Sequence, residues 1–351
     1  MAISSSKGRL ETAAGAASAS RTERAAWNRT RFIGSDPGGH YESYFQRANH
    51  PQRALAFWIR YTVFSPKGRP ADAVGELWAI YFDGERERIT AVKEVVPISA
   101  CRFAEQGLDV RIGSASLDDG QLQGQARSGA NRLEWDLRYT GDEPPLLLLP
   151  AALYERGFPR AKALVGAPSA RFDGVLSVNG EAVDVSGWVG SQNHNWGSRH
   201  TDSYAWGQVA GFDDAPRTFL ECSTARLKLG PFWTPPMTVL VLRLEDREIR
   251  LNSLTQAFRA RGEFDFPSWR FESRAPGVRV SGTIHAPKSL FVGLTYDNPP
   301  GGAKTCLNTK LAACEVTVEE VGRPPRVLST KHRAAFEILT ERPDRGVPVL
   351  A

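Results

Sequence analysis

Short apolar runs separated by turn residues dominate the chain from Tyr41 onward. The runs are rich in Val, Ile, Tyr, Phe and Trp, and Gly, Pro, Asp and Asn lie between them, a pattern typical of strands. Asn179-Gly180 is the strongest hairpin signal among them. The expected strands cover residues 55–64, 74–82, 132–140, 175–185, 203–212, 218–229, 238–245, 248–254, 270–273, 278–285, 311–320 and 326–338. Only 151–158 (AALYERGF) indicates a short turn of helix.

Some fourteen or more strands over two domain lengths predict an all-β protein with two antiparallel barrels or sandwiches in tandem. We place the first at residues 36–200 and the second at 201–351. Residues 1–35 lack apolar periodicity and are mostly small or polar, so we expect them to form a disordered basic tail.

One predicted strand carries side chains of mixed character on both faces. Trp58, Arg60 and Thr62 share one face, and Phe57, Ile59, Tyr61 and Val63 share the other. This is expected where one face packs and the other lines a cavity. The alternative is a sandwich in which Arg60 simply pairs with Glu76 on the next strand.

The charge distribution argues against a nucleic-acid partner. The 351 residues carry a net charge of +5, but residues 1–31 hold six Lys/Arg against two Glu, and the rest of the chain holds 38 basic against 37 acidic residues. A nucleic-acid binder concentrates basic charge on its folded surface.

The four cysteines indicate a reducing compartment. Cys101, Cys222, Cys306 and Cys314 form neither a disulfide framework nor a CxxC pattern. The N-terminus has no apolar signal region, and the longest apolar stretch, near 144–154, is about half of what a membrane helix needs. We therefore expect a cytoplasmic location without stable membrane insertion.

The segment 187–212 (GWVGSQNHNWGSRHTDSYAWGQVAGF) concentrates polar and aromatic residues where an ordinary strand would repeat Val and Ile. Side-chain alternation puts His194 with Trp196, and Tyr204 with Trp206 and Gln208, on shared faces of two strands broken near Gly197.

The next strand holds a candidate acid. Glu221 stands among apolar neighbours in TFLEC, and it shares a face with Phe219. Burial of such a carboxyl raises its pKa and suits it to donate a proton. The alternative is an ordinary ion pair with Arg199, Arg217 or Arg226.

The string NHNWG, followed by RHTDSYAWGQVAGF, resembles the (D/N)HxWG motif of the AttH-like and acyclic carotenoid hydratase (hydroxyneurosporene synthase) families. The resemblance extends to YESYFQRAN at 41–49, AFWIRYT at 56–62 and CLNTKLA at 306–312, and it spans about residues 36–345. It implies tandem lipocalin-like β-barrels, an architecture that the fungal lipocalin-like Diels–Alderases share.

The resemblance also implies site residues. A His-x-Trp pair and a later Tyr-x-acid pair carry the reaction in the carotenoid hydratases. His194 and Trp196 match the first pair, and Glu221 matches the acid of the second, although Phe219 replaces its Tyr. Tyr204 could supply a hydroxyl instead. Asn193 stands where many relatives have Asp.

These observations predict a cofactor-independent hydratase or cyclase for a hydrophobic, isoprenoid or polyene-like substrate. Glu221 would donate the proton, Trp196 would stabilise the carbocation through its ring face, and His194 with Tyr204 would place water or take up the proton. The cavity would lie at the junction of the two halves, bounded by Trp206, Gln208, Trp58, Trp78 and Phe219.

Three alternatives remain at this stage. The chain could be a lipocalin-like carrier of a lipid or other apolar molecule without chemistry. His194 could be a structural residue that orients the backbone. A zinc site from His194, His200 and Asp202 would need three side chains to converge at about 2.0 to 2.2 Å, and we expect neither metal nor cofactor. The expected partner is a hydrophobic small molecule, with transient membrane contact to collect it.

Overall fold

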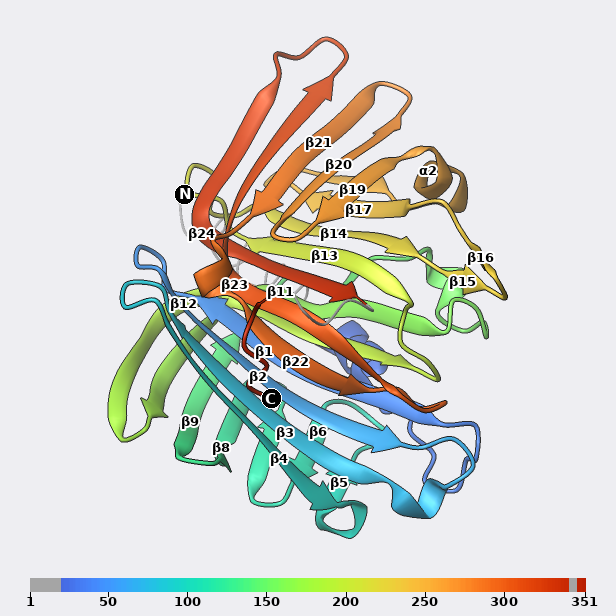
Figure 1. Ribbon diagram of the computed structural model, residues 1–351. Helices are drawn as coiled ribbons and strands as arrows, with labels where there is room; N and C mark the ends of the chain where they lie inside the picture. The colour runs from blue at the N-terminus through green and yellow to red at the C-terminus, as the bar shows by residue number, and fades with distance from the viewer. Residues whose placement is uncertain (1–19, 341–345) are drawn as a thin grey trace, which may run out of the picture.

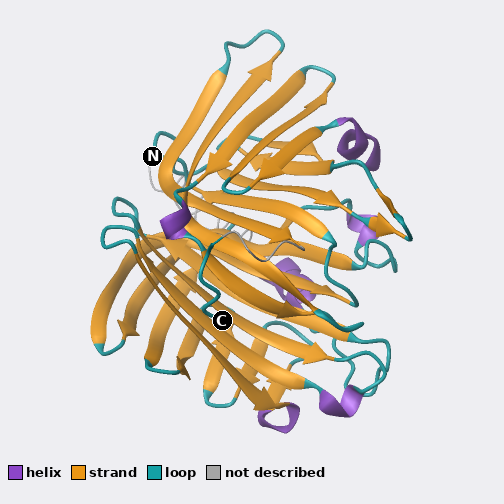
Figure 2. Ribbon diagram, in the orientation of Figure 1, coloured by secondary structure: helices purple, strands orange, loops and turns teal. Residues whose placement is uncertain are grey.

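Two large antiparallel sheets make up the computed structural model, which describes residues 20–340 and 346–351 (Figure 1). The chain is 61% strand and 8% helix, and Figure 2 shows strands running through both halves. The all-β class and the paired sheets that the strand pattern predicts are confirmed.

The first sheet, called sheet A, is nearly a closed barrel. Its hydrogen-bonded order is β4-β3-β2-β1-β12-β11-β9-β8-β7-β6-β5, with β10 paired to β11. Its strands are β1 (His40–Asn49), β2 (Leu55–Ser65), β3 (Val74–Asp83), β4 (Arg88–Pro97), β5 (Cys101–Phe103), β6 (Asp109–Ile112), β7 (Ala115–Asp118), β8 (Gln121–Ser128), β9 (Asn131–Thr140), β10 (Leu146–Leu147), β11 (Ala161–Val178) and β12 (Glu181–Gly197).

The second sheet, called sheet B, has the order β18-β17-β14-β13-β24-β23-β21-β20-β19, with β22 paired to β23. Its strands are β13 (Ser203–Ala210), β14 (Phe219–Arg226), β17 (Met237–Arg243), β18 (Glu248–Leu251), β19 (Arg261–Asp265), β20 (Ser268–Ala275), β21 (Val278–His285), β22 (Val292–Asp297), β23 (Ala303–Glu320) and β24 (Arg326–Thr340). A separate hairpin of β15 (Lys228–Leu229) and β16 (Phe232–Trp233) projects from it.

The helices among the described residues are short. The helix α2 (Leu254–Arg259) starts with a capping box, in which Ser253 and Gln256 satisfy each other's backbone N–H groups. Single 3-10 turns occur at η1 (Pro70–Asp72), η2 (Ile98–Ala100), η3 (Ala151–Leu153) and η4 (Lys288–Leu290). The turn expected within 151–158 is therefore present in its first half.

Period-two alternation gives each half its own core. On β2, Phe57, Ile59 and Tyr61 point into the core of sheet A. Trp58 points to the opposite side, where a third apolar cluster fills the space between sheet A and sheet B. We call this the junction layer; its buried apolar members include Phe45, Ala56, Trp58, Trp78, Ile80, Phe82, Trp206, Val292, Leu294, Tyr296, Cys306, Leu311, Ala335 and Leu339.

The two sheets follow one strand plan. In sheet A the long hairpin β11–β12 is joined by a turn at Asn179-Gly180, where both residues have positive φ as the predicted turn requires. In sheet B the long hairpin β23–β24 has the same role, and each hairpin contains register shifts near its middle. These bulges bend the strands, so that one end of each hairpin packs in the core of its own sheet and the other end packs in the junction layer.

The expected disordered tail is wrong for residues 20–35, while residues 1–19 lie outside the described residues. Residues 20–28 are helical and pack onto sheet A. Arg24 pairs with Asp119 at 2.9 Å, and the Asn28 amide donates to Gln192 at 2.8 Å. Because these contacts are made by polar side chains, apolar periodicity gave no sign of them.

Candidate active site

Both ring nitrogens of His194 lie within hydrogen-bond distance of oxygen atoms of the protein. It is fully buried on β12, Nε2 lies 2.8 Å from Glu42 Oε1, and Nδ1 lies 3.1 Å from the Trp27 carbonyl oxygen. Its ring stacks on Tyr44 with centroids 4.2 Å apart. Since each nitrogen already faces an oxygen acceptor, neither is free to meet a ligand.

Glu42 is the centre of this inner cluster. Its carboxylate accepts hydrogen bonds from the Tyr44 hydroxyl, from His40 and His194, from the Thr30 hydroxyl and from the Arg31 backbone N–H. Burial acts to raise the pKa of Glu42, but the hydrogen bonds from His194 and His40 outweigh burial and hold that pKa well below its ordinary value. The cluster therefore contains an ionised carboxylate that ties residues 27–31 to β1 and β12.

Trp196 already has a cation on its ring. The Arg31 guanidinium carbon lies 4.3 Å from the Trp196 ring centroid, and the rings of His194 and Tyr154 lie 4.6 and 5.9 Å away. A cation–π contact is thus formed inside the protein. Trp196 belongs to a small cluster with Tyr154 and Leu164, apart from the junction layer.

The expectation that His194, Trp196 and Glu221 approach one cavity is not met. Register pairs His194 with Tyr44 and Trp196 with Glu42, on the face of sheet A that bears its inner core. Glu221 projects from β14 toward the junction layer. The reason is alternation, because β12 directs its even-numbered residues here away from sheet B.

Glu221 is a buried carboxyl without an ion pair in the described part of the chain. It is 2% exposed; Oε1 accepts from Trp206 Nε1 and Oε2 from Gln208 Nε2, both at 2.8 Å. Burial raises its pKa to about 7, although these two hydrogen bonds and the charge of Arg47 act in the opposite direction. A carboxyl in this state is poised to exchange a proton near neutral pH.

The Arg alternatives for Glu221 are excluded by their own contacts. Arg199 pairs with Asp202 and Arg217 with Glu245, while Arg226 lies over the Trp233 ring. The Arg60–Glu76 alternative is also wrong: register places Arg60 opposite Trp78, and Glu76 pairs with Lys93 at 2.9 Å.

A polar network, of which the sequence shows only one sign, holds Gln208 in place. Its amide nitrogen donates to Asn193 Oδ1 as well as to Glu221, and its amide oxygen accepts from Arg47 Nε and from Ser191, all at 2.7 to 2.8 Å. Every donor and acceptor of the Gln208 amide is therefore used, which fixes its orientation. The one available signal was the shared odd parity of Ser191 and Asn193.

A second acidic group lies near Glu221 in the junction layer. Glu337 on β24 forms an ion pair with Lys310 at 2.7 Å and accepts from Asn308. The Tyr204 hydroxyl points at its other oxygen at 3.4 Å. Burial raises the pKa of Tyr204 well above its ordinary value, so the phenol is neutral.

The remaining predicted residues surround these groups. Trp58 and Trp78 are buried in the junction layer with ring centroids 6.4 Å apart, and Trp206 is 9% exposed beside them. Phe219 is fully buried in a neighbouring apolar cluster with Val165 and Val241. The structure thus brings Glu221, Tyr204, Trp206, Gln208, Trp58 and Trp78 to one layer.

No metal site forms from the three proposed ligands. His200 Nε2 faces the Asp297 carbonyl oxygen at 3.1 Å, and Asp202 pairs with Arg199 and Lys304. Within 20–340 and 346–351, no group of three His, Cys, Asp or Glu side chains converges on a point.

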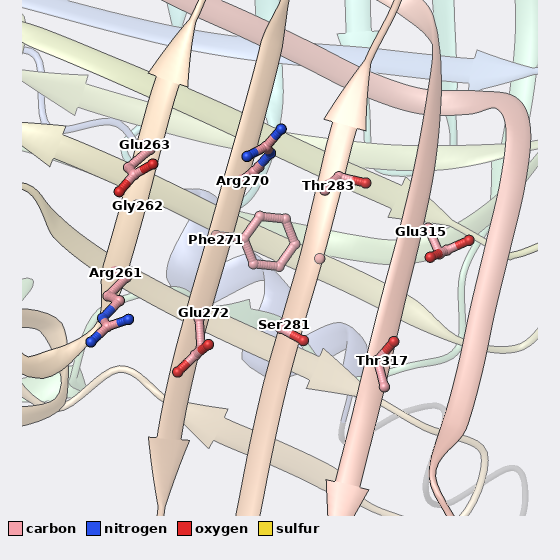
Figure 3. A pocket seen from close by; sticks show the side chains of 11 residues that line it. Arg261, Gly262, Glu263, Arg270, Phe271, Glu272, Ser281, Thr283, Glu315 and Thr317 are labelled. Atoms are coloured by element: carbon pink, nitrogen blue, oxygen red, sulfur yellow. The ribbon is translucent and has the colours of Figure 1, made fainter.

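An open hollow of about 330 Å³ lies on the outer face of sheet B (Figure 3), and Glu221 is not among the residues that line it. Arg261, Arg270, Glu272 and Glu315 line it, and Glu272 is already paired with Arg279. The hollow is a charged outer surface of β19, β20, β21 and β23 and contains none of the groups described above.

Comparisons with known proteins show the fold. No family model matches the chain. Two proteins of Mycobacterium tuberculosis, MT0513 of strain CDC 1551 and Rv0493c of strain H37Rv, both described as uncharacterized, are each 26% identical over 330 residues, or 92% of both chains.

Among solved structures, an AttH-type protein of Nitrosomonas europaea is similar at 14% identity and a TM-score of 0.54, covering 86% of this chain and 91% of that one. Kievitone hydratase of Nectria haematococca is similar at 13% identity and 0.55, covering 88% and 90%. CghA is similar at 12% and 0.53, covering 88% and 89%. The chain therefore has the AttH-like, tandem lipocalin-like fold. Across the described residues, no helix has the length and apolar character that crossing a membrane requires.

Proposed function

We propose that this chain is a cofactor-independent hydratase or cyclase that acts on a hydrophobic, isoprenoid or polyene-like substrate at the junction layer. The observation that carries the proposal is Glu221: a buried carboxyl with a pKa of about 7 and no ion pair among the described residues, held by Trp206 and Gln208. The shared fold with kievitone hydratase adds support for hydration as the reaction class.

Glu221 would act as the proton donor. Each of its oxygens accepts one hydrogen bond from the protein, so each keeps a second lone pair that can carry the acidic proton. Transfer to a substrate C=C bond forms a C–H bond, leaves the carboxylate, and places positive charge on the adjacent carbon. The two donors then stabilise the carboxylate that remains.

Trp206 takes the role that the sequence suggested for Trp196. The Trp206 indole is anchored by its Nε1–H on Glu221, so its ring lies directly beside the proton donor. A desolvated ring face stabilises a cation by roughly 2 kcal/mol. The Lys310 ammonium also lies over this ring, 5.4 Å from its centroid, which is farther than Arg31 lies from Trp196 at 4.3 Å. In the proposed arrangement, Trp196 and His194 support the fold of sheet A around Glu42.

Two groups could place the attacking water or remove a proton. The Tyr204 hydroxyl is linked to Glu337, which gives it a carboxylate that can receive a proton. Asn195 Oδ1 is buried on the same face of β12 as Asn193 and meets no hydrogen-bond donor among the described residues. Hydration would use the water, and cyclisation would use a second double bond of the substrate.

The proposed partner is an apolar small molecule, collected through transient contact with a membrane surface. The β15–β16 hairpin supports this route because Leu229 and Phe232 are 60% and 75% exposed beside Lys228. Exposed apolar tips flanked by basic residues suit the lipid interface.

The test of the function is turnover of polyene and isoprenoid substrates in deuterium oxide. We expect wild-type product to carry one solvent deuterium on carbon, and Glu221→Gln to lower kcat by about 100-fold or more. Glu263→Gln, on the outer face of sheet B, is the control and should match wild type.

The carrier alternative makes a different forecast. A ligand recovered unchanged and without deuterium from wild type, with equal affinity in Glu221→Gln, would assign the chain to ligand transport and reject the enzymatic proposal.

A further inference from the structure

Arg60 is a buried cation in the junction layer. It projects from β2 between the sheets, is 4% exposed, and its guanidinium carbon lies 4.6 Å from the Tyr296 ring centroid. The rings of Trp58 and Trp78 each lie 5.8 Å from it. A charge removed from water in this way is costly unless a partner compensates it.

The lysines of this region, unlike Arg60, have acidic partners. Lys310 pairs with Glu337, Lys93 with Glu76, and Lys304 with Asp202. Arg47 lacks an acidic partner within 4 Å in the described residues, but side-chain and backbone oxygens surround it.

Arg60 differs from all of these. Within the described residues, its side chain makes one hydrogen bond, from Nη2 to the Ser43 hydroxyl at 2.7 Å, and its buried Nε–H has no partner. No carboxylate of residues 20–340 or 346–351 forms an ion pair with it.

A second unpartnered donor lies beside it. The indole Nε1–H of Trp58 is buried and meets no acceptor in the described structure. Since Arg60 Nε and Trp58 Nε1 can only donate, the group that both lack is an acceptor. Buried polar atoms without partners in a native fold are uncommon and call for a missing ligand or water.

The surroundings favour a negative acceptor over a neutral one. Burial, followed by the charges of Arg60 and Lys304, lowers the pKa of His200 to about 3 even though the Asp297 carbonyl acts in the opposite direction. Burial is the largest of these causes; the charge of Arg60 also acts on His200, and it would stabilise an anion placed beside the guanidinium.

Aromatic side chains connect Arg60 with Glu221. Trp78, Trp58, Phe45 and Trp206 form a row with successive ring centroids 6.4, 6.1 and 6.2 Å apart. Arg60 lies at the Trp58–Trp78 end, and Glu221 is bonded to Trp206 at the other. The row joins a fixed cation to a proton donor through aromatic rings, and the Lys310 ammonium, paired with Glu337, lies 5.5 and 5.4 Å from the ring centroids of Trp58 and Trp206.

We propose that the junction layer binds an elongated apolar ligand with an acidic oxygen group, such as a carboxylate, whose head is held by Arg60 and Trp58 Nε1 and whose apolar chain follows the aromatic row toward Glu221. The proposal rests on the proposed function, since it defines the substrate class of the same site. It adds that the substrate is amphipathic and anionic.

The test compares probes that differ only in the head group. All-trans-retinoic acid and retinol, and the C12 to C18 fatty acids with their matching alcohols, are titrated into the full chain with tryptophan fluorescence and calorimetry as readouts. We expect the acids to bind at least about tenfold more tightly than the alcohols. Arg60→Gln should remove that preference, and Arg60→Lys should keep part of it because the charge remains.

Two controls separate this proposal from the proposed function. Glu221→Gln should keep the preference for acids while turnover is lost. The ligand-free Arg60→Gln variant should melt no lower than wild type, because it removes an uncompensated buried charge. Melting of both proteins is followed without probe, which checks that the variant is folded.

Three results would overturn the assignment: equal or absent binding of acids and alcohols by wild type, an unchanged preference in Arg60→Gln, or a high-resolution crystal structure with retinoic acid in which only ordered water meets Arg60 Nε and Trp58 Nε1. Equal binding of acids and alcohols by wild type, together with intact turnover of neutral substrates, would leave the enzyme proposal standing and reject the anionic head group.

Discussion

Asn193 and His194 are consecutive residues of β12, and their side chains point to opposite faces of sheet A. Asn193 accepts from Gln208 of sheet B, whereas His194 bonds to Glu42 of β1. The NHNW string at 193–196 therefore contributes to two separate clusters, an inner one around Glu42 and a junction one around Glu221. A variant at either position should report on its own cluster only.

Stability should fall as the pH rises through the range set by Glu221. Its folded pKa is raised to about 7 and its unfolded value is near 4.5, so the folded state keeps a proton that the unfolded state has lost. The contribution is fully present below about pH 4.5 and is lost by about pH 7, a difference of about 3 kcal/mol. Urea unfolding at a series of pH values should show this slope in wild type and not in Glu221→Gln. An identical slope in the two proteins would contradict the assignment.

Trp206→Phe should move the alkaline limb of the activity profile upward. The Trp206 Nε1–H stabilises the ionised form of Glu221, so its loss raises the Glu221 pKa further above 7. The kcat profile measured between pH 5 and 10 would then retain activity at higher pH. A matched control is Trp233→Phe, because Trp233 lies on the β15–β16 hairpin; it should leave the profile in place.

Breaking the Glu42–His194 pair should destabilise the protein strongly. Both side chains are fully buried and 2.8 Å apart, and removal of one member of a buried pair costs about 3 to 5 kcal/mol. A double-mutant cycle with Glu42→Gln and His194→Gln, followed by urea unfolding, should give clear coupling. Glu85→Gln breaks an exposed pair with Arg53 and should change stability by less than about 1 kcal/mol. Coupling near zero in the buried cycle would show that the pair contributes nothing.

Deletion of residues 1–31 should lower the melting temperature by more than about 4 °C. The sequence alone predicts no such loss, but the deletion removes Asn28 from Gln192 and the Thr30 and Arg31 donors from Glu42. Differential scanning calorimetry of the truncated chain measures this. Arg69→Ala, at an exposed pair with Asp72, should melt with wild type. A truncated chain that melts with wild type would restore the original expectation.

Membrane contact should depend on the β15–β16 hairpin. The double variant Leu229→Ser with Phe232→Ser removes its exposed apolar side chains and should reduce cosedimentation with anionic phosphatidylserine vesicles several-fold. Val321→Ser is the control, since Val321 is 86% exposed at the turn between β23 and β24, far from this hairpin (Figure 1). Equal loss in both variants would indicate nonspecific adsorption.

The fold could be predicted largely because alternation leaves a direct mark on the sequence. β2, β3, β9 and β21 begin and end within one or two residues of the expected positions. The short strands β5 to β8 were not anticipated, because each contains only two apolar residues, too few for a clear alternation. Such strands take their stability from neighbours in the sheet, which a local pattern does not contain.

The site could be predicted in part for the same reason. The parity of Tyr204, Trp206 and Gln208 correctly grouped them on one face, and the apolar context of Glu221 indicated its burial. Which side of β12 meets sheet B depends on long-range register and bulges, so Asn193 could not be distinguished from His194 in advance. Arg47 is 161 residues from Gln208, and no local signal links them.

The repeated strand plan brings corresponding hairpins together at the junction layer. The β1–β2 hairpin of sheet A contributes Arg47 and Arg60, and the β13–β14 hairpin of sheet B contributes Glu221 and Gln208. If two copies of the first half packed through that face, four arginines would meet at the interface, and the opposing hairpin would supply no acidic residue there. Two copies of the second half would lack the guanidinium that holds Gln208. Because the two halves contribute unequal charges, neither half is complementary to a second copy of itself at this face. The charges therefore favour packing of a first half against a second half and oppose association of two like halves.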